Sequence, residues 1–197
     1  MKIYSCNITD ISEAELHKSF FAMSKERQKS TLRLQNKQKQ KAKIAADRLC
    51  RLAISEHCGV SPESIIFTLN EKGKPYAADL NVFFNVSHSG DMVVCAVSDN
   101  EIGIDIEKIR PINLKAAEKF ACSNEIEYME QTQNGFFEIW TLKEAYFKCI
   151  GTGLGNDIKT VSFGVNNNKI LCSAPGFECA FHSICNGYIC STCKKIR

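Results

Sequence analysis

Two acidic residues close together in the chain are the first candidates for chemistry. Asp105 and Glu107 alternate with isoleucines in the segment Gly103-Ile-Asp-Ile-Glu107. This period of two predicts a strand with one apolar and one polar face, which places the two carboxylates about 7 Å apart on the same face. Carboxylates at that range repel each other unless a cation lies between them, and oxygen ligands of this kind suit Mg²⁺. The alternative is a strand edge with two solvated acids, which the motif alone does not exclude.

A second group of polar residues lies on a predicted helix over residues 135–150. Trp140, Glu144 and Lys148 recur every four residues and therefore share one face of this helix. A surface ion pair between Glu144 and Lys148 would contribute only about 0.3 kcal/mol. The remaining surface of the helix is mostly apolar, however, which predicts that the helix is largely buried. A buried carboxylate and amine need partners, and a metal ion held by the acidic strand would be one.

A third candidate is the segment Asn85-Val-Ser-His-Ser-Gly90. Ser87 and His88 stand at the end of a predicted strand, just before a glycine. Hydroxyls, backbone amides and an imidazole can bind a phosphate at such a position. A structural histidine with partners of its own is the alternative. Lys74 and Pro75 lie in a preceding turn and add a cation held by a rigid backbone.

The positive charge of the chain is concentrated in one region. The formal net charge is only +3, yet residues 25–51 hold ten lysines and arginines against Glu26 and Asp47. This distribution predicts an anionic partner of limited size, such as a nucleotide or an acidic protein. No Phe, Tyr or Trp lies between Phe21 and Phe67 to stack on bases, which argues against nucleic acid.

Length and composition indicate a globular protein in a reducing compartment. The chain has 197 residues, of which 44% are hydrophobic and 24% charged. We expect a cytoplasmic protein that binds no membrane, because the N-terminus lacks the apolar core of a signal peptide and no apolar run reaches membrane-spanning length. The eleven cysteines are therefore expected to be free thiols. Zinc binding at Cys185, Cys190 and Cys193, with His182 nearby, is the less favoured alternative.

The patterns of apolar residues and breakers predict an α+β fold. Predicted helices begin at Asp10 or Ser12, span residues 40–57 up to Gly59, and span residues 113–120, 125–131 and 135–150. Predicted strands cover residues 1–6, 64–69, 83–87, 92–98, 102–106, 161–165, 169–172, 178–182 and 187–193. Helices followed by strands occur twice. We therefore expect two similar halves, residues 1–100 and 101–197, with a cleft between them.

Taken together and in this order, these motifs resemble the 4′-phosphopantetheinyl transferases. The resemblance is carried by NVSHSG, GIDIE and WTLKEAYFK, and it extends from GKPY to the last predicted strand, over most of the chain. The length is similar to that of the larger type, in which one chain holds two pseudo-symmetric halves and acts as a monomer. The family moves the phosphopantetheine arm of coenzyme A to a serine of an apo acyl or peptidyl carrier protein and releases 3′,5′-ADP.

The resemblance implies roles for the residues of the catalytic centre. Asp105, Glu107 and Glu144 would hold Mg²⁺, which bridges the pyrophosphate oxygens of coenzyme A. Lys148 would contact the pyrophosphate, and we expect it to stabilise charge because the nearby anions oppose a role as base. Glu125 matches a family glutamate proposed as an alternative base.

The resemblance also implies residues that bind coenzyme A. The adenosine end would be held by Lys74, Pro75, Ser87 and His88, with His88 on the 3′-phosphate. Ala42 stands where the family usually has an arginine for that phosphate, so Lys41 and Lys43 are expected to replace it. Near the start of the basic region, Glu26 stands where a lysine is common, whereas Lys29 matches the next cation.

Three functions are compatible with these features. The favoured one is a transferase with coenzyme A and a carrier protein as partners, the latter docking near residues 112–119. The second is a non-catalytic module that uses residues 25–51 to bind nucleic acid or an acidic protein. The third is another Mg²⁺-dependent phosphoesterase, although the chain has no P-loop and no Rossmann glycine fingerprint.

Overall fold

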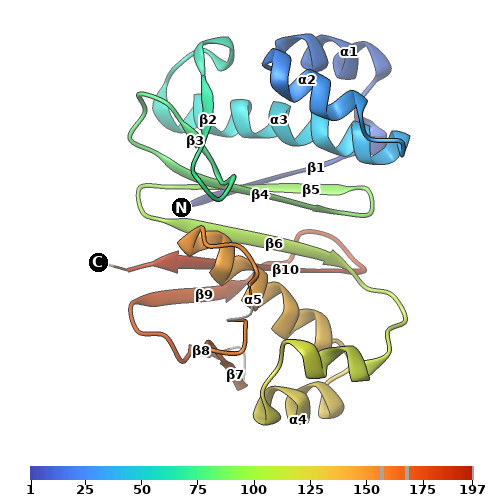
Figure 1. Ribbon diagram of the computed structural model, residues 1–197, viewed down its shortest axis with the longest axis vertical. Helices are drawn as coiled ribbons and strands as arrows, with labels where there is room; N and C mark the ends of the chain where they lie inside the picture. Colours follow the sequence, from blue (N-terminus) through green and yellow to red (C-terminus); the bar gives the residue numbers. More distant parts are fainter. Residues whose placement is uncertain (156–157, 167–168, 197) are drawn as a thin grey trace.

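The order of secondary-structure elements occurs twice along the chain. The computed structural model describes residues 1–155, 158–166 and 169–196. Each half contains a strand, helices, a small hairpin and two further strands (Figure 1). The first half contains β1 (Lys2–Asn7), η1 (Ile8–Asp10), α1 (Glu13–Ala22), α2 (Lys25–Leu32), α3 (Lys37–Cys58), η2 (Pro62–Ser64), β2 (Phe67–Leu69), β3 (Pro75–Ala77), β4 (Phe83–Ser89) and β5 (Met92–Ser98). The second contains β6 (Ile102–Lys108), η3 (Leu114–Lys119), α4 (Ser123–Gln131), α5 (Gly135–Ile150), β7 (Phe163–Asn166), β8 (Lys169–Cys172), β9 (Phe177–Phe181) and β10 (Tyr188–Lys195).

Two three-stranded antiparallel sheets form the centre of the molecule. Their strand orders are β1-β5-β4 and β6-β10-β9, so the last strand of each half lies in the middle of its sheet. The hairpins β2–β3 and β7–β8 form separate two-stranded sheets. This arrangement confirms the predicted α+β fold.

The sheets are stacked between the two long helices, α3 and α5 (Figure 1). One face of β5 carries Val93, Cys95 and Val97 into a core with α3. Its other face packs against the isoleucines of β6, with Cys190 of β10 in the same cluster. On its opposite face the second sheet is covered by α5. The isoleucines of β6 therefore lie between the sheets, which agrees with the predicted apolar face of this strand.

A glycine allows α5 to lie very close to β6. A Cβ atom added at Gly103 would lie 1.9 Å from the carbonyl oxygen of Ala145 and 2.5 Å from the backbone nitrogen of Cys149. Both contacts are with helix backbone, which cannot turn aside as a side chain can. Gly103 therefore fixes the distance between the acidic strand and the helix that carries Glu144 and Lys148.

Helix ends follow local sequence, with some differences from expectation. Ser12 and Glu15 form a capping box at the start of α1, and Gly59 and Gly151 end α3 and α5 in the left-handed conformation. The helix expected near residues 113–120 is a 3₁₀ helix, because only a short stretch is available before α4 begins at Ser123. Helix α2 was not predicted, because its composition is too polar to show apolar periodicity. None of the described helices combines the length and apolarity needed to cross a bilayer.

Candidate active site

Side chains of β4 connect the first half of the chain to the acidic strand β6. Alternate residues of β4 point towards β6 and bond to one backbone amide and to both acidic side chains there. The contacts are Ile104 N to Asn85 Oδ1 at 3.0 Å, Ser87 Oγ to Asp105 Oδ1 at 2.6 Å, and Ser89 Oγ to Glu107 Oε2 at 2.9 Å. Both candidate metal ligands on β6 are thus positioned by hydroxyl groups from the other sheet.

Asp105 is the most buried of the three acids. The residue is only 4% exposed, and burial raises the pKa of its carboxyl group although the Lys148 ammonium acts in the opposite direction. Its Oδ1 accepts hydrogen bonds from Ser87 and from Lys148 Nζ, the latter at 2.5 Å. Its Oδ2 is buried and has no hydrogen-bond partner among the described residues. A buried carboxylate oxygen without a partner is costly, so this atom is a candidate ligand for a cation.

Glu144 and Lys148 reach the same place from α5. Desolvation raises the pKa of the half-buried Glu144 to about 7, with smaller contributions in the same direction from Asp105 and Glu107. Lys148 opposes this shift. Both strand acids thus lie within electrostatic range of Glu144. The prediction that the polar groups on this helix have buried partners is confirmed for Lys148, which pairs with Asp105.

The donor set at this site fits a hard divalent cation. It offers three carboxylates, one of which has a buried oxygen without a partner (Asp105 Oδ2), and oxygen ligands of this kind match the preference of Mg²⁺. With the side chains as placed, no three acidic, histidine or cysteine groups among the described residues are arranged to hold a metal ion. Lys148 instead supplies the positive charge on Asp105. A divalent cation would therefore share Asp105 with Lys148, and the acidic side chains would have to adjust to bind it.

The residues expected to bind coenzyme A are only partly brought together. His88 follows Ser87 on β4 and has an exposed side chain. The protein around it still removes part of its hydration, which lowers the pKa of the imidazole, and Lys148 adds to the effect. Ser87 points inwards to Asp105. Lys74, beside Pro75 of β3, donates to the carbonyl of Cys149 at 2.8 Å near the end of α5.

The expected lysines of the basic region have other partners or lie apart. Lys41 forms an ion pair with Glu13, and Lys43 donates to Ser30 Oγ at 2.7 Å. Lys29 is exposed in the last turn of α2. None of the three is among the charges that affect the pKa of His88, which include Lys39 on the first turn of α3.

Comparisons with known proteins assign both halves to one family. The family model "4′-phosphopantetheinyl transferase superfamily" matches residues 101–193, and "4′-phosphopantetheinyl transferase, N-terminal" matches residues 10–100. The 4′-phosphopantetheinyl transferase Sfp of Bacillus subtilis (strain 168) is 34% identical over 170 residues, which cover 82% of this chain and 75% of that protein. This chain belongs to the 4′-phosphopantetheinyl transferase superfamily. The gsp transferase of Aneurinibacillus migulanus is 38% identical over 152 residues, 75% of this chain and 63% of that protein.

Glu125 has other partners than the acidic cluster. It is 0% exposed, and its carboxylate pairs at 3.0 Å with Lys143, which is also 0% exposed. It also accepts hydrogen bonds from the backbone nitrogens of Cys122 and Phe163. With these partners and no exposed surface, Glu125 has the contacts of a structural residue that holds α4, α5 and β7 together. The expectation of a base at this position has no support in these contacts.

Three charged residues have contacts that were not expected from the sequence. Lys143 is a fully buried cation paired with Glu125, away from the acidic cluster. Arg110 donates to Glu107 at 3.0 Å, and its guanidinium lies 5.4 Å from the centre of the Phe137 ring. Lys39 was seen only as part of a general basic region. A cation three residues after Glu107 was a signal for the Arg110 contact, whereas the other two contacts depend on tertiary packing.

Proposed function

We propose that this chain transfers the 4′-phosphopantetheine arm of coenzyme A to a serine hydroxyl of an apo carrier protein, with Mg²⁺ bound by Asp105, Glu107 and Glu144. The observation that carries the proposal is the buried group of Asp105, Ser87 and Lys148 beside Glu144, with Asp105 Oδ2 left without a partner. Mg²⁺ bound there would neutralise charge that develops on the pyrophosphate. Family membership supports the reaction.

The chain's own residues have separable roles in this proposal. Ser87 and Ser89 hold the two strand carboxylates in place, and Arg110 holds Glu107 from the other side. Lys148 has one flexible ammonium group that can move from Asp105 to a pyrophosphate oxygen of coenzyme A and stabilise its charge. We assign no proton transfer to Glu125, because its carboxylate is fully buried and paired.

For the 3′-phosphate of coenzyme A we propose His88 and Lys39. Desolvation is the main cause of the lowered pKa of His88, and Lys148 and then Lys39 add smaller effects in the same direction, so Lys39 lies within electrostatic range of His88. Lys41 and Lys43 already have protein partners. The expected result of His88→Ala is a raised KM for coenzyme A with kcat largely kept, because the lost contact is to a non-reacting group. A loss confined to kcat would contradict this assignment.

The carrier protein is proposed to dock near residues 112–119 as a partner with an acidic surface. Ile109 and Ile112 are exposed there, and Lys115 and Lys119 add positive charge. We also propose that the chain divides near residue 100 into two halves and acts as a monomer, since each half repeats the same element order.

The alternative of a basic binding module has less support. Arg27 and Arg51 both pair with the buried Asp47, at 2.7 Å and 2.8 Å. Lys41 and Arg48 pair with glutamates of α1. Much of the positive charge of residues 25–51 therefore stabilises the packing of α1, α2 and α3, and less of it is free for a ligand.

The test is incubation of the protein with coenzyme A, Mg²⁺ and a candidate apo carrier protein. The expected result is a mass gain on the carrier equal to one phosphopantetheine. Asp105→Ala and Glu144→Ala should abolish this labelling and the thermal shift caused by Mg²⁺, while the exposed control Glu130→Ala keeps both. Near-normal labelling by either of the first two variants would remove the metal-site assignment.

A further inference from the structure

Four cysteines from different elements meet beneath the C-terminal part of α5. They are Cys149 of α5, Cys172 of β8, Cys179 of β9 and Cys193 of β10. The Sγ atoms of Cys179 and Cys193 lie 3.0 Å apart. The thiols of Cys149 and Cys172 lie near enough to interact with those of Cys193 and Cys179, respectively, and to share their shifts in pKa. The four thiols form a cluster that contains none of the proposed metal ligands.

This group differs from the cysteine motif that the sequence suggested. Cys190 and Cys193 are an odd number of residues apart on β10, so they project to opposite faces of the sheet. Cys190 lies between the two sheets, whereas Cys193 faces α5. Cys185 is exposed in the β9–β10 connection. Cys185, Cys190 and Cys193 therefore do not converge on one zinc site, and no group of residues placed to hold a metal occurs in the part of the chain that the structure describes.

The positions of Cys179 and Cys193 suit a disulfide bond. They are directly opposed on the antiparallel strands β9 and β10. Opposed residues of antiparallel strands have Cα atoms about 4.5–5.5 Å apart. That range lies within the roughly 4.4–6.8 Å that disulfides span. Bond formation therefore requires little backbone movement.

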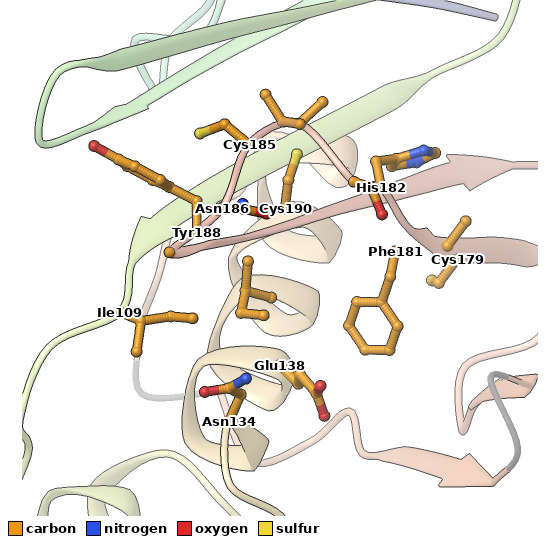
Figure 2. Close-up of a pocket in the computed structure, with 15 residues that line it drawn as sticks. Ile109, Asn134, Glu138, Cys179, Phe181, His182, Cys185, Asn186, Tyr188 and Cys190 are labelled. Atoms are coloured by element: carbon orange, nitrogen blue, oxygen red, sulfur yellow. The ribbon is translucent and has the colours of Figure 1, made fainter.

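Cys179 is the member of the pair that a reagent can reach. It is only partly buried, whereas Cys193 is completely buried. Cys179 lies on the border of a cavity of about 750 Å³ between β9, β10, their connection and the start of α5 (Figure 2). Hydrogen bonds from Cys172 and Cys193 lower the pKa of the Cys179 thiol to about 5, which favours the nucleophilic thiolate. Cys179 is therefore the thiol that we expect to react first with a disulfide reagent.

We propose that Cys179 and Cys193 form a reversible disulfide by exchange with a small-molecule disulfide that enters this cavity. The Cys179 thiolate attacks one sulfur of the reagent RSSR, a mixed disulfide forms, and RS⁻ leaves. Cys193 then gives its proton to RS⁻ and attacks the Cys179 sulfur, which forms the protein disulfide and releases the second RS⁻. Two protein thiols are oxidised, and one RSSR is reduced to RSH and RS⁻.

The experiment uses the full chain with Cys185→Ser, which removes an exposed competing thiol. The protein is treated with oxidised glutathione in the presence of EDTA, denatured, alkylated with a maleimide and mapped by mass spectrometry. The expected result is a loss of two alkylatable thiols and a cross-linked peptide pair containing Cys179 and Cys193, both reversed by dithiothreitol. A raised thermal midpoint should accompany the cross-link, because it restrains the unfolded chain.

Two further variants separate the steps. Cys193→Ser should retain one glutathione on Cys179, because the resolving thiol is absent. The matched control Cys190→Ser removes a buried cysteine from the other face of β10 and should still form the cross-link. Full alkylation of Cys179 and Cys193 after treatment of the parent would overturn the proposal. So would a cross-link between other cysteines, or binding of one zinc ion per chain that protects the four thiols when EDTA is omitted.

Discussion

The close contact between Gly103 and α5 leads to a prediction about both stability and activity. Replacement of Gly103 by alanine places a Cβ atom 1.9 Å from the carbonyl oxygen of Ala145. To restore an ordinary contact of 3.4 Å, α5 would have to move away from β6 by about 1.5 Å. Overpacking of a core usually lowers the free energy of unfolding by about 1–3 kcal/mol. Because the new Cβ of Gly103→Ala meets helix backbone, which cannot move aside, we expect a loss of about 3 kcal/mol or more.

The same movement would disturb the site, because α5 carries Glu144 and Lys148. A displacement of about 1 Å can cost roughly 100-fold in rate when reacting groups depend on exact placement. We therefore expect Gly103→Ala to lower the free energy of unfolding by about 3 kcal/mol, and kcat of the folded fraction by about 100-fold.

A matched control is available in the same half of the chain. At Gly164 of β7 an added Cβ meets only the Cβ of Leu171, at 3.9 Å, which is an ordinary contact. Gly164→Ala should therefore leave stability within about 0.5 kcal/mol of the parent. Urea unfolding followed by circular dichroism measures both variants, and carrier labelling measures kcat. Equal stability of Gly103→Ala and Gly164→Ala would show that a side chain at position 103 does not push α5 away from β6, and it would refute the prediction.

Three other predictions follow from single contacts. Lys143→Met should lower the free energy of unfolding by about 3–5 kcal/mol, because it leaves the buried charge of Glu125 without its cationic partner. Urea unfolding measures this loss. The double variant with Glu125→Gln should regain part of the lost stability, and no recovery would contradict this cause. Lys39→Ala should raise the KM for coenzyme A more than Lys41→Ala does, since Lys39 lies within electrostatic range of His88 whereas Lys41 is paired with Glu13. If steady-state kinetics show the larger rise for Lys41→Ala, Lys41 and not Lys39 binds the 3′-phosphate. Hydrogen bonds from neighbouring thiols lower the pKa of Cys179 to about 5, so its thiolate predominates above that pH and its alkylation rate should reach half-maximum near pH 5. A midpoint near pH 9, read by peptide mapping, would contradict the lowered pKa.

Local sequence determined the elements of this protein and the faces they present. Alternation in β6 separated its isoleucines from its acids, because successive residues of a strand point to opposite sides. Helical spacing put Glu144 and Lys148 on one face of α5, whose bounds agree with those expected. Capping residues and glycines marked several helix ends. These features depend on neighbours within a few residues, so the chain itself contains the information.

Only the tertiary structure decided which of these faces met. Ser87 was a candidate phosphate ligand by sequence, but the packing of β4 against β6 turns its hydroxyl towards Asp105. Glu125 was a candidate base, but the packing of α4 on α5 buries it against Lys143. The pair of Cys179 and Cys193 likewise depends on the register of β9 and β10. Burial and long-range pairing are properties of the assembled core, and no local pattern in the sequence encodes them.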